Sequence, residues 1–89
     1  MSRPRWRYGA VPMRLTMIEW IPVTGSTRIT AEAYDPATET IYVRFPNGVE
    51  WQYAACPPHV WEAFTSPGQS RGQYIHQVLN FKPNGRYSG

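Results

Sequence analysis

The sequence predicts a small α+β domain: a three-stranded antiparallel meander followed by two short helices, with an extended N-terminal arm ahead of the sheet. Three observations support this fold class. Three segments between residues 26 and 53 alternate apolar and polar residues, as half-buried strands do. The apolar spacing changes to a helical period after Pro57-Pro58. The chain has 89 residues, which is enough for one hydrophobic core but not for two.

The first 17 residues are predicted to form an arm outside the core. Pro4, Gly9 and Pro12 interrupt any helix, and no strand alternation is sustained there. The arm has no acidic residue and mixes basic with aromatic side chains; its candidate contact residues are Arg3, Arg5, Trp6, Arg7, Tyr8 and Arg14. We therefore divide the chain into an arm of residues 1–17, a domain of residues 18–82 and a turn-rich tail of residues 83–89.

Three strands are predicted between residues 26 and 53. The first runs from residue 26 to residue 34, and its inward side chains are expected to be Ile29, Ala31 and Ala33. A turn at residues 35–38 and an Asn-Gly hairpin at residues 46–48 separate it from strands at residues 40–45 and 49–53. The inward residues of these two strands are expected to be Ile41, Val43, Phe45, Val49, Trp51 and Tyr53.

Two helices are predicted after the sheet. The first begins at Pro57-Pro58, because the first helical turn tolerates proline, and it ends before Pro67. Ser70 is the expected N-cap of the second helix, which covers roughly residues 71–80. One stripe of this helix is apolar: Tyr74, Ile75, Val78 and Leu79. The opposite stripe is polar without charge: Gln73, His76, Gln77 and Asn80.

Charge is segregated along the chain. Residues 1–18 carry a net charge of +4, residues 19–62 carry −4 and residues 63–89 carry +3. Eight of the nine basic residues are arginine, whose planar fork of donors suits phosphate and carboxylate groups. This distribution indicates that a partner contacts the two ends of the chain rather than a cleft in the sheet.

The segment from about Ser26 to Asn80 resembles the KTSC domain, a module that occurs alone in bacterial and phage proteins and at the C-terminus of some lysyl-tRNA synthetases. The residues that carry the resemblance are Ser26, Tyr34-Asp35, Ile41-Tyr42-Val43, Phe45-Pro46-Asn47-Gly48, Trp51-Gln52-Tyr53, Cys56-Pro57, Val60-Trp61 and Ser70-Arg71-Gly72-Gln73-Tyr74. Trp51 stands where the family pattern has tyrosine, and Cys56 where it has an aliphatic residue. The resemblance implies the α+β fold, and the synthetase appendage raises an expectation of RNA binding.

We expect a non-enzymatic binding module, and nucleic acid, specifically RNA, is the first partner considered. Cations would contact phosphates, while amides, imidazole and flat rings would contact bases. Besides the arm, the candidate residues are Tyr42, Arg44, Arg71, Gln73, His76, Gln77, Asn80, Lys82 and Arg86. The competing interpretation is that aromatic residues on strands belong to the core and that the polar stripe is a solvated helix face.

The alternative partner is a protein assembly. A phage or prophage accessory protein could dock through its arm, because arginine and aromatic residues dominate the centres of protein interfaces. The acidic middle of the chain favours this alternative, since it would repel a phosphate backbone laid across the sheet. The expected location is the cytoplasm of a bacterial host, or the virion, and the oligomeric state is left open.

Catalysis, metal binding and membrane insertion are not expected. Cys56 precedes a helix and has His59 three residues later, but no acid is placed to orient that histidine. One cysteine and two histidines do not supply a zinc site. No apolar run approaches the roughly 20 residues of a membrane span. We expect no cofactor and no small-molecule substrate.

Overall fold

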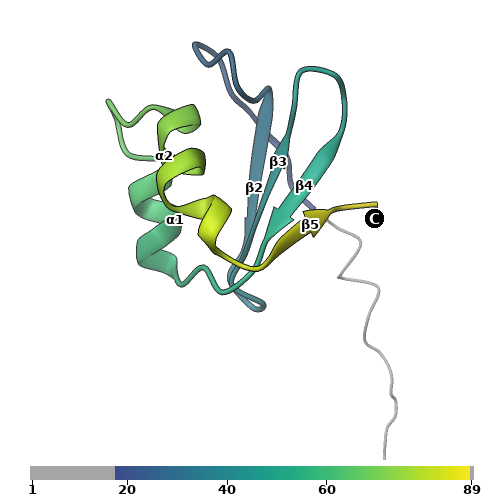
Figure 1. Ribbon diagram of the computed structural model, residues 1–89, viewed down its shortest axis with the longest axis vertical. Coiled ribbons are helices and arrows are strands. Elements are labelled where there is room, and N and C mark those ends of the chain that lie inside the picture. The colour runs from purple at the N-terminus through teal and green to yellow at the C-terminus, as the bar shows by residue number, and fades with distance from the viewer. Residues whose placement is uncertain (1–17, 89) are drawn as a thin grey trace, which may run out of the picture.

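The computed structural model describes residues 18–88, and the predicted arm lies outside the described residues. The described chain forms an antiparallel sheet whose five strands follow one another in space in the order of the sequence. Two helices pack against one side of this sheet (Figure 1). The α+β class is therefore as the sequence predicts, and so is the order in which three meander strands precede two helices. No helix within residues 18–88 has both the length and the apolar character to cross a membrane.

The elements are β1 (Ile21–Pro22), β2 (Ala31–Asp35), β3 (Thr40–Arg44), β4 (Glu50–Tyr53), α1 (Pro58–Phe64), α2 (Arg71–Gln77), the 3₁₀ turn η2 (Leu79–Phe81) and β5 (Asn84–Arg86). The predicted three-stranded meander corresponds to β2, β3 and β4. The sheet gains an edge strand on each side, so the three-stranded prediction is incomplete. Strands of two and three residues are too short to show an alternating pattern, and the Asn-Gly pair inside β5 is typical of a turn.

The second predicted helix is also shorter than expected. The α-helical part ends at Gln77, and the chain tightens into η2 before it enters β5. The expected C-terminal tail thus begins with a strand that pairs with β4. This pairing brings the end of the chain back onto the sheet.

The prediction of which side chains of the first strand face the core is partly wrong. Ile29 is fully buried in the core, as expected. In β2, however, Glu32 lies opposite Val43 and therefore faces the helices, while Ala31 and Ala33 lie on the other face of the sheet. The alternation slips by one residue before β2 begins. The reason is a contact distant in sequence: the carboxylate of Glu32 pairs with Arg71 in the helix layer, and the two alanines are small enough to be buried on the opposite face of the sheet.

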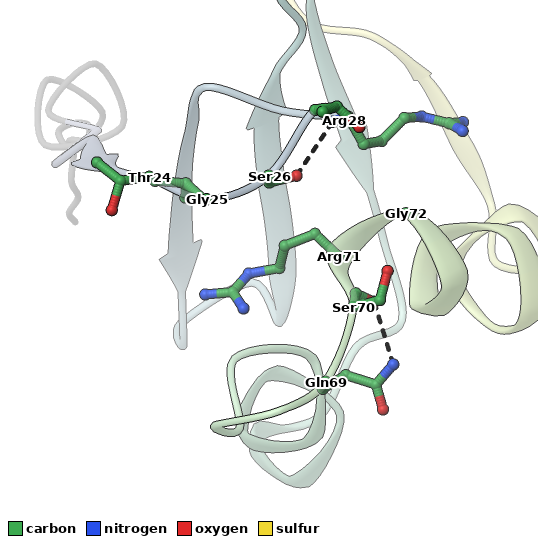
Figure 2. A pocket seen from close by; sticks show the side chains of 10 residues that line it. Thr24, Gly25, Ser26, Arg28, Gln69, Ser70, Arg71 and Gly72 are labelled. Carbon is green, nitrogen blue, oxygen red and sulfur yellow. Dashed lines mark hydrogen bonds between the residues drawn. The ribbon is translucent and has the colours of Figure 1, made fainter.

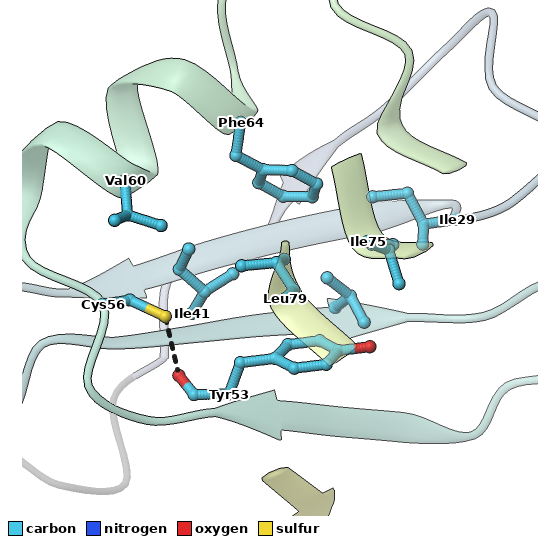
Figure 3. Packing of buried hydrophobic residues seen from close by; sticks show 9 residues of the cluster. Ile29, Ile41, Tyr53, Cys56, Val60, Phe64, Ile75 and Leu79 are labelled. Atoms are coloured by element: carbon cyan, nitrogen blue, oxygen red, sulfur yellow. Dashed lines mark hydrogen bonds between the residues drawn. The ribbon is translucent and has the colours of Figure 1, made fainter. Parts of the chain in front are cut away.

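One hydrophobic core lies between the sheet and the helices (Figure 3). It consists of Ile29, Ile41, Val43, Tyr53, Cys56, Val60, Phe64, Ile75 and Leu79. Phe45 and Trp51 are partly buried against it. The inward residues predicted for the second and third strands, apart from Val49, are therefore confirmed, as are the buried residues of both helices. This packing decides which side of α2 faces solvent.

Candidate partner-binding surface

Arg71 is held inside the domain rather than presented to a partner. Its Nε donates to Glu32 Oε1 at 2.7 Å, and a terminal guanidinium nitrogen donates to Glu32 Oε2 at 2.9 Å. The side chain of Glu32 is 5% exposed and that of Arg71 19% exposed. Hydrogen bonding to this carboxylate raises the pKa of Arg71. The guanidinium carbon also lies 5.4 Å from the centroid of the Phe64 ring, so this predicted phosphate ligand has a structural role.

Arg44 is likewise paired within the sheet. Its Nε donates to Glu50 Oε2 at 2.9 Å, across the ladder between β3 and β4. Its guanidinium carbon lies 4.5 Å from the centroid of the Trp20 ring, a cation–π distance. The Arg44 side chain is 36% exposed to solvent. Arg44 therefore contributes part of its charge to the outer face of the sheet, the face away from the helices.

Tyr42 shares that outer face but is covered. The ring is 8% exposed, with Trp20 and Tyr87 packed edge-on against it at centroid distances of 6.4 and 4.8 Å. Burial raises the pKa of the Tyr42 phenol. A nucleic-acid base has no free ring face here on which to stack. The aromatic cluster of Trp20, Tyr42 and Tyr87 instead closes the side of the sheet that the helices leave uncovered.

The polar stripe of the second helix is exposed, as predicted. All four of its side chains, which lie on α2 and η2, are exposed: Gln73, His76, Gln77 and Asn80. The Ser70 hydroxyl accepts the N–H of Gln73 and caps α2, while Ile75 and Leu79 anchor the opposite side in the core. Backbone capping and core packing together fix the orientation of this stripe.

Phe81 extends this surface, and the sequence analysis missed it. Its side chain is 83% exposed, the highest value among the described large apolar residues. The ring directly follows Asn80 at the end of η2. In the sequence, Phe81 continues the apolar stripe of the second helix, so helical spacing predicts that it is buried. It points outward because the chain changes from α-helix to 3₁₀ turn before it. We call Gln73, His76, Gln77, Asn80 and Phe81 the docking surface.

Two basic residues flank the docking surface. Lys82 is half-buried and Arg86 is exposed, and neither forms an ion pair with any residue in the range 18–88. Asn84 fixes the segment between Lys82 and Arg86. Its Oδ1 accepts from Trp51 Nε1 at 3.0 Å, and its Nδ2 donates to the Lys82 carbonyl at 2.8 Å. A shallow depression of about 340 Å³ lies alongside, lined by Gln52, Ala54, Pro83, Asn84 and Gly85.

The other predicted contact residues lie elsewhere or outside the described range. Arg3, Arg5, Trp6, Arg7, Tyr8 and Arg14 belong to the arm and are not among the described residues. Of the predicted contact residues that are described, the structure places Gln73, His76, Gln77 and Asn80 on the exposed side of α2 and η2, Lys82 directly after η2 and Arg86 in β5. It separates from them Tyr42 and Arg44, which lie on the outer face of the sheet.

A second depression, of about 370 Å³, separates the loop of residues 23–28 from the start of α2 (Figure 2). The Ser26 hydroxyl accepts the N–H of Arg28 and turns this loop. A Cβ placed on Gly72 would lie 3.5 Å from Cβ of Arg28, so the absence of a side chain at Gly72 lets helix and loop approach. The side chains of Arg28 and Arg71 extend away from each other rather than converging on the depression. The contacts of Ser26 and Gly72 serve the fold.

Cys56 lies in the core and not in a reactive site. Its side chain is fully buried, and Sγ lies 3.5 Å from the Tyr53 carbonyl oxygen. Burial raises the pKa of this thiol, which disfavours the thiolate needed for nucleophilic attack. His59 is exposed on α1. Within residues 18–88, no three histidine, cysteine, aspartate or glutamate side chains are close enough together to hold a metal ion.

Comparison with known proteins points to one family. The KTSC domain model matches residues 25–82. A crystal structure of a KTSC domain protein from Yersinia pestis superimposes with a TM-score of 0.70 at 24% sequence identity, over 81% of this chain and 100% of that one. No curated protein matches the chain. The structural match supports the observed fold.

Proposed function

The chain belongs to the KTSC domain family, and from this premise we propose that it is a non-enzymatic module that binds a protein partner through the docking surface. The observation that carries the proposal is the 83% exposure of Phe81 beside four exposed, uncharged side chains. The centres of protein interfaces are enriched in aromatic residues and depleted in charge. Burial of the Phe81 ring against a partner would explain why the domain alone leaves this apolar side chain exposed to solvent.

The charge of the described residues supports a protein partner over nucleic acid. Residues 18–88 contain five basic and six acidic residues, a net charge of −1. Two of the five basic residues, Arg44 and Arg71, are already paired with carboxylates. Affinity for a phosphate backbone depends on the number of cations free to neutralise phosphates. Few such cations are present on this part of the chain.

The position of Cys56 supports the non-enzymatic part of the proposal. A catalytic thiol needs access to substrate and a lowered pKa. Cys56 has neither access nor the lowered pKa, and its polar contacts are with backbone carbonyls of Tyr53 and Ala54. The thiol is therefore assigned to packing, in the position where the family resemblance implies an aliphatic residue.

RNA is the second candidate, and specific residues favour it. Lys82 directly follows Phe81 and Arg86 lies in β5, both without carboxylate partners among the described residues, and the docking surface offers three amides and an imidazole. The arm adds four arginines. A single strand could stack a base on the exposed ring and place phosphates on these cations. Such binding weakens steeply as salt increases, which separates it from protein docking.

The test compares the full chain with two single variants. Phe81→Ser removes the exposed ring, and Ile21→Ser removes the other large exposed apolar side chain, which is 50% exposed on β1 at the opposite edge of the sheet. Immobilised wild type and Ile21→Ser are expected to recover the same protein from a nuclease-treated bacterial lysate, while Phe81→Ser does not. Recovery by the wild type and by both variants would contradict the proposal. If the wild type recovers the protein only from an untreated lysate, and if a labelled single-stranded RNA binds the wild type in a salt-dependent manner, RNA is the partner.

A further inference from the structure

The edge of the sheet at β5 is open. Among residues 18–88, β5 pairs only with β4 (Figure 1). The Ala54 N–H donates to the Pro83 carbonyl at 2.8 Å, and the Tyr87 N–H donates to the Glu50 carbonyl at 2.9 Å. In an antiparallel pair, residues that bond across the ladder alternate with residues that do not. The backbone groups of Asn84 and Arg86 therefore point away from β4, and no described residue bonds to them.

The opposite edge is protected in a way that β5 is not. Strand β1 has two residues, and one of them is Pro22, which has no N–H to donate. A proline on an edge strand is a common protection of the sheet edge against further pairing. Strand β5 contains no proline, and Pro83 precedes it. Within β1 the outward backbone groups are those of Pro22, which offers an acceptor and no donor, whereas β5 presents both donors and acceptors.

The side chains around this edge define the partner chemistry. Arg86 lies opposite Trp51, and Lys82 precedes the strand, so two cations without described carboxylate partners flank the open backbone groups. The exposed Phe81 ring lies at the entrance to the same segment. An added strand that alternates acidic and apolar residues would pair its carboxylates with these cations and place an apolar side chain near the ring.

We propose that the open edge of β5 binds an extended, acidic segment of the protein partner as a sixth strand. This inference rests on the proposed function, because it assigns the partner of the docking surface a chemistry and a mode of binding. Main-chain hydrogen bonds to Asn84 and Arg86 supply affinity, while Arg86, Lys82 and Phe81 select the sequence of the added strand. The occupied edge removes the unpaired donors and acceptors from solvent.

The test measures fluorescence anisotropy of a labelled peptide of alternating valine and glutamate against the full chain. A valine–lysine peptide of the same length is the control for charge, and a labelled single-stranded RNA is the control for partner class. Arg86→Gln removes the charge and keeps the outward N–H, so it is expected to weaken the acidic peptide by about tenfold. Arg86→Pro removes the N–H as well and is expected to abolish binding, while far-ultraviolet circular dichroism verifies that the variant folds.

Hydrogen exchange gives a second readout that needs no variant. Bound acidic peptide is expected to slow exchange of the Asn84 and Arg86 amides in the wild-type chain and to leave the Gln52 amide unchanged. Absence of acidic peptide binding, equal binding to Arg86→Pro or unchanged exchange at both amides overturns strand addition, as does binding of RNA in place of the peptide. If Phe81-dependent protein capture persists while the peptide fails, the proposed function stands without strand addition; if both fail, the proposed function is wrong as well.

Discussion

At the scale of single residues, the pair between Arg71 and Glu32 is expected to contribute to stability more than any other described ion pair. Both side chains are largely buried and the contact is bidentate. Arg71→Ala leaves a buried carboxylate without its partner, so we expect the free energy of unfolding to fall by about 3 kcal/mol. Urea denaturation measures this value. Arg86→Ala, at an exposed and unpaired arginine, is the matched control and should change stability by less than about 0.5 kcal/mol. Equal effects of the two substitutions would contradict a structural role for Arg71.

Tyr53 gives a residue-scale prediction for alkaline pH. Its ring is 2% exposed, and burial raises the pKa of the phenol above its ordinary value of 10.0. The folded chain therefore holds this proton more tightly than the unfolded chain. The resulting stability is fully present below pH 10.0 and is lost as the pH rises through the folded-state pKa. Urea denaturation at a series of pH values should show stability falling above pH 10, and Tyr53→Phe should reduce that slope. An unchanged slope would show that other buried phenols cause the loss.

At the scale of elements, helix α2 depends on its N-cap. The helix has seven residues, which is too short to be stable on propensity alone, and the Ser70 hydroxyl satisfies the Gln73 N–H at 3.2 Å. We expect Ser70→Ala to lower the free energy of unfolding by about 1 kcal/mol. Ser66→Ala is the control, because the exposed Ser66 hydroxyl lies between the two helices and donates only to the carbonyl of Glu62 in α1, so it caps no part of α2. Denaturation curves that coincide for the two variants would show that core packing alone fixes the start of α2.

The elements that the sequence predicted correctly are those with a local signal. Strands β3 and β4 alternate around an Asn-Gly turn, and both helices begin at recognisable proline or serine positions. The missed features depend on contacts distant in sequence. Strand β5 exists because it pairs with β4, and the inward position of Glu32 depends on Arg71, 39 residues later. The candidate site divides in the same way. Helical spacing predicts the polar stripe, but the exposure of Phe81 depends on how η2 packs in the folded domain, which helical spacing does not predict.

At the scale of the whole molecule, the separation of charge between arm and domain decides how the chain responds to polyanions. The protein carries +3 in total, and Arg3, Arg5, Arg7 and Arg14 supply +4, so the rest of the chain carries −1. Two of the basic residues of the domain are also neutralised internally. Any attraction of the folded chain to a polyanion must therefore come mainly from the arm. The sheet and helices contribute shape and apolar contact instead.

This balance predicts the behaviour of a variant in which all four arm arginines are replaced by glutamine. The wild-type chain is expected to bind a heparin column at low salt and to elute as salt increases, since counterion release governs such binding. The variant, with a net charge of −1, is expected to pass through the column. The double variant Lys82→Gln with Arg86→Gln retains a net charge of +1 and is expected to bind, eluting slightly earlier than wild type. If the arm variant instead eluted with wild type, the cations outside the arm, such as Lys82 and Arg86, would be sufficient for polyanion binding, and RNA would become the favoured partner of the docking surface.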